Sequence, residues 1–372
     1  MKRFFALLMA ALLALGCFAA CGQQPAQESE PDAPATSADT SATPADTLAS
    51  EGDLEPAVTY PASGGDLEID GKGVTLALVI AGTFGDRSFY DSSKQGVARL
   101  AADYGVNVVQ IECNNENFEA QMRNAADLAD VVVCVGWEFW EIETVAPQYP
   151  EVRWIWVDNE TSAPIDNVLN IVYAQNEGSF LAGYIAASMS KTGVIGAVGG
   201  EEGSDTIDDF IVGYTQGAKY YDESITVEVN YTNSYDDPTK GKFCANALID
   251  LGADVIFQIA SAAGDGVFEA AAERGVYAIG VDSDQKYIND AVIICSMKKE
   301  VGNSIYDAVI QLLSGNTGLW GTTWIADLNN GYVGIGYGEA GATQQVSDDI
   351  KMTVDTLAQK IINGEIVVDT TR

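Results

Sequence analysis

The chain has 372 residues, 47% of them hydrophobic and 9% aromatic, enough to build two domains around sizeable cores. The balance of 19 Lys and Arg against 54 Asp and Glu gives a formal net charge of −35. This charge argues against a nucleic-acid partner, because a phosphate backbone repels an acidic surface. The absence of histidine excludes a Ser-His-Asp triad, a Cys-His pair and histidine metal sites, and we expect neither a metal nor another cofactor.

The first 21 residues are predicted to be a lipoprotein signal peptide. Two positive residues precede an apolar stretch, 4–15, that is too short to span a membrane and leads into small residues and cysteine. The segment "FAAC" resembles a bacterial lipobox, so Cys21 is predicted to carry the lipid, with Cys17 as the alternative. A plain secretory signal with two incidental cysteines is the other interpretation. A diacyl anchor holds stably, which predicts a lipid-anchored protein on the cell membrane, facing outside the cytoplasm.

Residues 22–72 are predicted to be an acidic, disordered tether. They are rich in Ala, Thr, Ser, Pro, Asp and Glu and hold few large apolar side chains, so burial cannot offset the entropy of ordering. The cysteines beyond the tether are Cys113, Cys134, Cys244 and Cys295. None forms a C-x-x-C pair and most lie in or beside apolar runs, so we expect buried structural thiols.

The remaining sequence alternates short apolar runs with helical patterns. Strands are predicted at 74–81, 106–113, 131–136, 152–158 and 168–173, and again at 194–200, 225–232, 254–260, 276–282, 291–297 and 331–337. Helices are predicted at 92–103, 178–189, 208–220, 240–251, 267–274, 301–313 and 349–362. Apolar strands that alternate with helices indicate parallel sheets covered on both faces.

The pattern repeats once, with a break near Lys191–Gly193. The predicted fold class is therefore α/β, with two doubly wound, Rossmann-like lobes and a ligand cleft between them. We assign residues 73–190 and about 292–318 to the N-terminal lobe, and 191–291 and about 328–372 to the C-terminal lobe. Ligands of open α/β sheets bind beyond the carboxyl ends of the strands, where this chain carries "GDRSFYD", "GWEFWE" and "GVDSDQ".

A set of ordered segments carries a family resemblance: "GDRSFYD", "VAPQYPEVRWIWVD", "EGSFLAGYIAASMSKTGVIGAVGG", "NSYDDPTKGK", "GADVIFQIASAAGDGV", "YAIGVDSDQ" and "SMKK". In order and spacing they resemble the basic membrane protein family of substrate-binding lipoproteins, whose best understood members bind purine nucleosides for an ABC importer. The resemblance covers essentially the whole chain from Val74 to the last helix. It implies a type I periplasmic-binding-protein fold, a nucleoside ligand, ABC permease subunits as partners, a monomer, and no enzymatic activity.

The resemblance also implies roles for single residues. Phe89 and Tyr235, where the family commonly has Phe, would hold the base between two rings, and stacking contributes about 1–3 kcal/mol per base. Asp282 would accept hydrogen bonds from the ribose diol, and Lys299 would donate to the ribose hydroxyls. Asp158 would accept from a ring N–H of the base.

Two further candidates are less defined. Gly264 lies in a small-residue turn whose backbone N–H groups could approach ligand oxygens, or it serves only the turn. Trp137 either lines the pocket or packs between the lobes. For the residues with implied roles, the alternatives are structural: ring packing within one lobe for Phe89 and Tyr235, a helix N-cap for Asp282, and a solvated side chain for Lys299.

The chain departs from the family at Tyr90, which stands where the family usually has Asn after Phe. An Asn offers the base both a donor and an acceptor, whereas tyrosine offers one hydroxyl and more bulk. A pyrimidine nucleoside, a riboflavin-like ring or a sugar therefore remain alternative ligands, and a sensor that feeds a membrane receptor is an alternative role. A nucleoside hydrolase is disfavoured because the first strand leads into "GTFGDRSFYD", without a D-x-D-x-x-x-D-D cluster.

Overall fold

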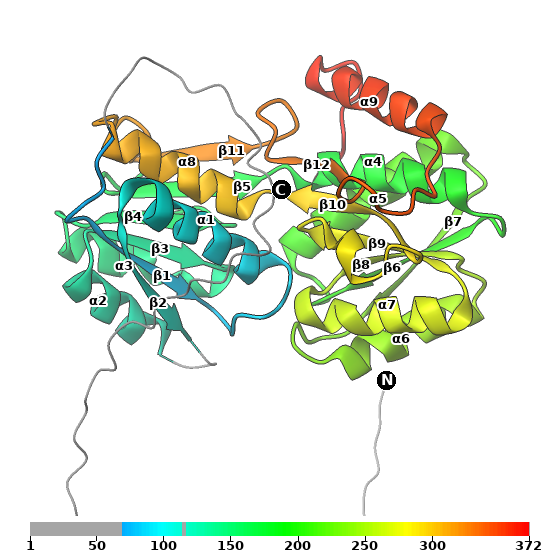
Figure 1. Ribbon diagram of the computed structural model, residues 1–372, viewed down its shortest axis with the longest axis horizontal. Coiled ribbons are helices and arrows are strands. Elements are labelled where there is room, and N and C mark those ends of the chain that lie inside the picture. The colour runs from blue at the N-terminus through cyan, green and yellow to red at the C-terminus, as the bar shows by residue number, and fades with distance from the viewer. Residues whose placement is uncertain (1–68, 114–116, 372) are drawn as a thin grey trace, which may run out of the picture. The chain divides into compact units, whose positions relative to one another are not determined.

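The computed structural model describes residues 69–113 and 117–371 (Figure 1). The predicted signal peptide, both candidate lipidation sites, Cys17 and Cys21, and nearly all of the predicted tether lie outside these residues. No helix within the described ranges combines the length and apolar character needed to cross a bilayer.

The first sheet has the strand order β11-β5-β4-β3-β1-β2, and every pairing in it is parallel. Its strands are β1 (Thr75–Ile80), β2 (Asn107–Glu112), β3 (Val131–Val135), β4 (Arg153–Val157), β5 (Val168–Tyr173) and β11 (Thr322–Ala326). Its helices are α1 (Phe89–Tyr104), α2 (Phe118–Leu128), α3 (Ile142–Val145) and α8 (Val301–Leu313), with 3-10 turns η1 (Trp137–Phe139) and η2 (Ala146–Gln148).

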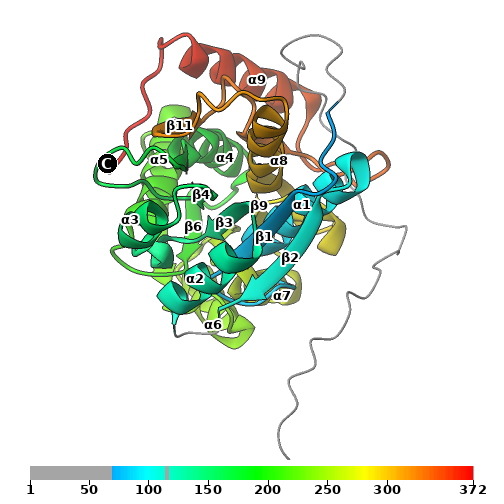
Figure 2. The same cartoon turned by 90° about the vertical axis from the view of Figure 1, so that its left-hand side faces the viewer.

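Alternate residues of β1 face opposite layers of this lobe. Leu76 and Leu78 join the core that includes residues of α1 and α8, while Ala77 and Val79 join the core that includes residues of α2. Helices α1 and α8 lie side by side in both views (Figures 1 and 2). They pack tightly at Gly96, where an added Cβ would collide with the α8 backbone at Gly302.

The second sheet has the order β12-β10-β9-β8-β6-β7, parallel except for the antiparallel pair β10–β12. Its strands are β6 (Val194–Gly199), β7 (Thr226–Tyr231), β8 (Val255–Ile259), β9 (Tyr277–Asp282), β10 (Ile293–Lys299) and β12 (Val333–Gly336). Its helices are α4 (Gln175–Met189), α5 (Asp205–Tyr221), α6 (Pro238–Asp250), α7 (Asp265–Arg274) and α9 (Asp348–Ile362), with 3-10 turns η3 (Ser261–Gly264) and η4 (Gln285–Ile288).

The two mostly parallel α/β sheets confirm the predicted fold class, and the four cysteines at 113, 134, 244 and 295 are free and buried, as expected. The assignment of segments to lobes differs from the sequence prediction. Strand β10, placed by sequence in the N-terminal lobe, pairs with β9 and β12 of the second sheet, and α4 packs on α5. An apolar run predicts a strand but does not show which sheet the strand joins. Helix α4 is buried and apolar on most sides, so its sequence pattern does not show which lobe it packs against.

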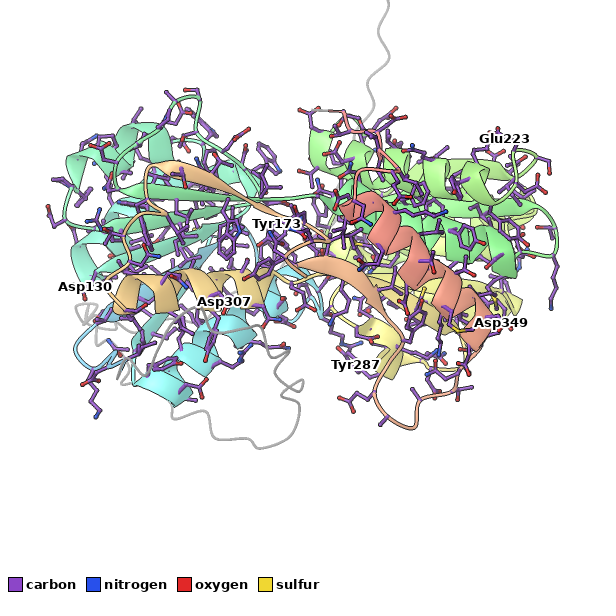
Figure 3. The ribbon with its side chains drawn as sticks, turned by 90° about the horizontal axis from the view of Figure 1, so that it is seen from above. Asp130, Tyr173, Glu223, Tyr287, Asp307 and Asp349 are labelled. Atoms are coloured by element: carbon purple, nitrogen blue, oxygen red, sulfur yellow. The ribbon has the colours of Figure 1, made fainter. Side chains whose placement is uncertain are left out.

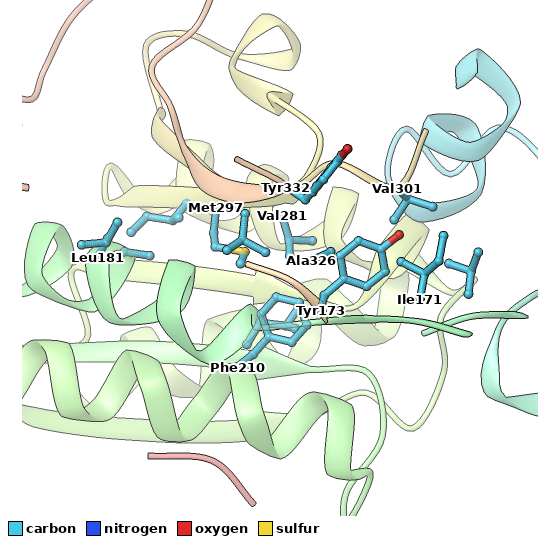
Figure 4. Packing of buried hydrophobic residues seen from close by; sticks show 14 of the residues in the cluster. Ile171, Tyr173, Leu181, Phe210, Val281, Met297, Val301, Ala326 and Tyr332 are labelled. Carbon is cyan, nitrogen blue, oxygen red and sulfur yellow. The ribbon is translucent and has the colours of Figure 1, made fainter. Parts of the chain in front are cut away.

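The chain passes between the sheets after β5, after β10 and after β11. Tyr173, the last residue of β5, lies near the first of these crossings (Figure 3). Its ring belongs to a core that also holds Phe210 and Val301 (Figure 4), and its hydroxyl hydrogen-bonds the Oγ of Ser304 on α8 at 2.6 Å. The crossings therefore pass through a packed core that both lobes share.

Candidate ligand-binding site

A pocket of about 90 Å³ lies where the carboxyl ends of strands from both sheets meet. The first lobe contributes Phe89, Tyr90, Gly136, Trp137, Glu138 and Asp158. The second lobe contributes Ser204, Thr206, Ile207, Phe210, Tyr235, Ile259, Ser261, Val281, Asp282 and Lys299. All of the sequence-predicted ligand residues except Gly264 line this pocket.

Gly264 has a packing role instead. It ends η3 and is buried, and an added Cβ would occupy the position of the Gln258 side-chain amide. That amide donates to the Gln285 Oε1 at 2.7 Å and accepts from the Ala260 N–H at 3.1 Å. The pocket contact of the turn comes from Ser261, three residues earlier.

The two predicted ring platforms come from different lobes. Phe89 is the first residue of α1, and Tyr235 lies in the loop between β7 and α6. The Tyr235 ring lies against Gly200, where any Cβ would strike it, and the Tyr235 carbonyl accepts from the Ala263 N–H at 3.0 Å. Glycine at position 200 and the contact with η3 therefore fix this ring at the pocket wall.

Tyr90 is a wall residue whose polar group is already used. Its hydroxyl donates to the Ala81 carbonyl at 3.0 Å, and its ring lies 5.4 Å from that of Phe89 at an interplanar angle of 56°. Burial, reinforced by the nearby Glu138 carboxyl, raises the pKa of Tyr90 well above its ordinary value. The hydroxyl proton is thus committed to the backbone.

Lys299 is the cationic side chain among the described lining residues. It is 1% exposed, and its Nζ lies 2.7 Å from the Asp158 Oδ1, an ion pair that joins β10 of the second sheet to the end of β4 in the first. The ammonium also lies 5.2 Å from the ring centre of Phe89, 4.9 Å from Tyr173 and 5.4 Å from Phe210. Rings offer a desolvated cation a favourable face, so this lysine is held on several sides.

Asp282 ends β9 and is 8% exposed. Its Oδ2 accepts from the Ser88 Oγ at 2.5 Å, a contact between the lobes. Burial raises the pKa of Asp282 to about 6, although Lys299 and the Ser88 hydroxyl favour the ionised form. A carboxylate with a remaining oxygen at the pocket can accept hydrogen bonds from a ligand.

The loop that precedes Phe89 is tied to the second lobe. The Asp86 carboxylate accepts hydrogen bonds from the backbone N–H groups of Tyr90 and Asp91, and these bonds cap the start of α1. It also accepts a hydrogen bond from the Ser261 Oγ at 2.9 Å. The Arg87 carbonyl accepts from Ser283 Oγ and Gln285 Nε2. Contacts between lobes have no local sequence signal, so these links could not be predicted from the sequence.

Backbone strain concentrates around the same pocket. Arg87, Asp158, Ser261 and Asp282 have φ of 53°, 73°, 49° and 63°, in the left-handed region that non-glycine residues rarely adopt. Each such residue costs on the order of 1–3 kcal/mol and persists where its surroundings fix it, as at ligand sites.

Glu138 is the charged lining residue that sequence reasoning missed. Its Oε2 is buried and has no hydrogen-bond partner among the described residues. Burial raises the pKa of Glu138 to about 7, although a hydrogen bond from its own backbone N–H to the carboxyl opposes the effect, and Glu201 and Asp158 raise it further. The available signal was its place in "GWEFWE", directly after β3, where a strand end faces the ligand.

A second cavity of about 510 Å³ adjoins the pocket, sharing Trp137, Asp158, Ser204 and Thr206. Its wall adds the carboxylates of Glu160, Glu201 and Asp205, and Trp137 is 51% exposed. In the pocket and this second cavity, carboxyl groups thus outnumber the one lysine, which favours a neutral or cationic ligand over a phosphorylated one. The described residues contain no group of three acidic, Cys or His side chains positioned to hold a metal.

Two mostly parallel α/β sheets with a pocket at their strand ends define a type I periplasmic-binding-protein fold, and solved structures of similar fold agree. An ABC transporter solute-binding protein from Aeropyrum pernix is 28% identical, with a TM-score of 0.72 over 80% of this chain and 94% of that one. A second, from Conexibacter woesei, is 25% identical, with a TM-score of 0.66 over 80% and 99%.

The family model of PnrA-like substrate-binding proteins of ABC transporters, Bmp, matches residues 73–372. Basic membrane protein A2 of Borrelia garinii subsp. bavariensis is 32% identical over 300 residues, which cover 79% of this chain and 87% of that protein. The chain belongs to the Bmp family of ABC-transporter substrate-binding proteins. Membership implies a ligand, permease partners and a location outside the cytoplasm.

Proposed function

We propose that this protein binds a nucleoside, with purine nucleosides as the leading class, and delivers it to an ABC permease. The supporting observation is the lining of the pocket: Phe89 and Tyr235 from opposite lobes beside the buried Asp282 and Lys299. Two rings suit a flat base, since aromatic stacking contributes about 1–3 kcal/mol per base and tolerates any base. The Asp282 carboxylate suits a vicinal diol, which presents two donors.

The carboxylates of the second cavity support a nucleoside over a nucleotide as the ligand. The carboxylates at 160, 201 and 205 make the field near the pocket negative, which disfavours a doubly charged 5′-phosphate, whereas a neutral nucleoside avoids that repulsion. We therefore expect adenosine, guanosine or inosine to raise the unfolding temperature more than the matching 5′-monophosphate does. Equal stabilisation by the monophosphate would contradict the electrostatic part of the proposal.

Ligand release is the broadest test of the proposed class. Mass spectrometry of small molecules freed by denaturing the natively purified protein should detect a nucleoside. A thermal-shift panel of adenosine, guanosine, inosine, cytidine, uridine, riboflavin and ribose then ranks the alternatives. Stabilisation by riboflavin or a free sugar alone, with no response to any nucleoside, would replace the proposed ligand.

The mechanism we propose is binding and transfer without chemistry. Ligand contacts from both lobes favour a closed form, and hinge closure is the motion by which this architecture presents its cargo. Incubation with a nucleoside should therefore return it intact, with no free base or ribose. Appearance of free base at a rate that scales with protein concentration would make the protein an enzyme.

We also propose that Cys21 carries the lipid anchor and that the folded part acts as a monomer. Metabolic labelling with a fatty acid should mark the wild-type chain and the Cys17→Ser variant but not Cys21→Ser. Labelling that persists in Cys21→Ser and disappears in Cys17→Ser would move the anchor to Cys17.

A further inference from the structure

Glu138 lies in η1, directly beyond β3, and shares the pocket wall with Gly136. Its carboxyl lies so close to Gly136 that a Cβ there would collide with its Oε2. That oxygen is buried, with no hydrogen-bond partner among the residues that the structure describes. A buried acceptor left unpaired costs about 1–3 kcal/mol, so the arrangement favours a ligand that brings a donor.

Two polar groups of the pocket near Glu138 are already engaged. The Tyr90 hydroxyl donates to the Ala81 carbonyl, and Asp158 is paired with Lys299 at 2.7 Å. Tyr90 occupies the position at which the family resemblance implies a base-reading Asn. Of these three groups, the Glu138 carboxyl keeps an oxygen that can read the base.

We propose that Glu138 is the specificity-determining residue of this pocket: its carboxylate accepts an N–H from the edge of the base, as a 6-oxopurine presents. This inference rests on the proposed nucleoside function. It selects nucleosides with an N–H donor over those without one, because a base that offers only acceptors leaves the buried Oε2 of Glu138 unpaired. Glu138 lies outside the ligand residues that the family resemblance implies.

The charged and titratable groups around Glu138 give the selection a pH dependence. Glu201 and Asp158 face it and, after burial, raise its pKa, to about 7, while Tyr90, Tyr235 and Cys113 are neighbours whose own pKa values it raises. Lys299 lines the same pocket. An N–H donor binds the ionised carboxylate more strongly than the neutral acid, so its affinity should rise with pH through about 7.

The experiment compares inosine with purine riboside by calorimetric titration at pH 6, 7 and 8. Purine riboside has the same ribose and bicyclic ring but no N–H on its base. The titration of Asp282 therefore affects both ligands equally and cancels in the ratio of their dissociation constants. For the wild type, we expect the preference for inosine to increase about tenfold from pH 6 to pH 8, as the ionised fraction of a group with pKa near 7 rises.

The variant Glu138→Gln keeps the shape of the side chain but removes its charge. We expect the preference for inosine at pH 8 to fall about tenfold and to stop changing with pH, because a neutral acceptor replaces a charged one. The matched control is Glu141→Gln. Glu141 also has a buried Oε2 without a partner among the described residues, but it does not line the pocket, so its variant should keep the wild-type ratio.

The outcomes separate this inference from the proposed function. If the wild type binds both nucleosides with a ratio that does not change with pH, the role of Glu138 is wrong and the nucleoside function stands. If the wild type binds neither nucleoside nor any other, the proposed function fails and the inference falls with it. If Glu138→Gln does not fold, the pH dependence of the wild-type ratio still decides.

Discussion

The two ends of the pocket differ in how their charged groups are satisfied. At the Asp282 end, formed by Asp282 and Lys299, the carboxylate accepts from the Ser88 hydroxyl and the ammonium is paired with Asp158. At the Glu138 end, formed by Glu138, Tyr90 and Trp137, a buried carboxyl oxygen has no partner among the described residues, and the tryptophan is half exposed. The Asp282 end keeps the residues that the family resemblance implies, and the Glu138 end is where this chain departs from them.

This contrast suggests that the two ends of the pocket have different roles in binding. A preorganised Asp282 end can hold the part that all nucleosides share, whereas the Glu138 end sets which base is accepted. Substitutions at the first end should therefore weaken every nucleoside, and substitutions at the second should change their ranking.

Asp282→Ala should cause the largest loss of affinity. It removes a charged acceptor for the ribose hydroxyls, and such hydrogen bonds contribute about 1.5–3 kcal/mol. Calorimetry should show a similar loss for every nucleoside that the wild type binds. A loss of affinity confined to nucleosides with one kind of base would show that Asp282 contacts the base and not the ribose.

Phe89→Ala should weaken nucleoside binding by about 1–3 kcal/mol, the contribution of one stacking platform. Phe243→Ala is the matched control, since Phe243 lies on α6, outside the pocket lining, and is 74% exposed. The dissociation constants of both variants, measured with one nucleoside, give the comparison. Equal affinities for the two variants would argue against a ring sandwich.

Asp282→Asn should raise the stability of the unliganded protein at pH 7 by about 1–2 kcal/mol. Burial raises the pKa of Asp282 from 3.8 to about 6, so the folded state binds its proton more tightly than the unfolded state does. The free energy of unfolding of the wild type therefore falls as pH rises from 3.8 to about 6. Denaturant unfolding at pH 4 and pH 7 should show the gain only at the higher pH, and a gain of equal size at both would contradict the burial argument.

Tyr90→Phe should have the smallest effect. Its hydroxyl bonds the Ala81 carbonyl, so the free energy of unfolding should fall by about 0.5–1.5 kcal/mol while nucleoside affinity stays the same. Denaturant unfolding and calorimetry measure the two quantities separately. A large loss of affinity with unchanged stability would show that the hydroxyl reads the ligand.

The fold class and most of the pocket could be predicted from sequence because both depend on local patterns. Apolar runs marked β1 and β9, and the resemblance placed Phe89 and Asp282 at their ends. The sheet that β10 joins could not be predicted, because strand pairing depends on contacts distant in the sequence. The role of Ser88 was hidden for the same reason, since its partner lies 194 residues away.

Tyr90 and Glu138 show a second limit. The sequence indicated that Tyr90 replaces a base-reading residue, but only the hydrogen bond to Ala81 shows that its hydroxyl is committed elsewhere. Likewise, an acidic residue after β3 could have been exposed. Its burial against Gly136 is a property of the folded pocket.

The central claim is that one nucleoside is held with its base at the two rings and its ribose at Asp282. A calorimetric titration of the wild-type protein with guanosine and with 2′,3′-dideoxyguanosine tests it most directly. We predict binding of one guanosine per chain and an affinity for the dideoxynucleoside that is lower by at least about tenfold, the equivalent of 1.4 kcal/mol. Equal affinities, or no heat with either compound and with any other nucleoside, would contradict the account.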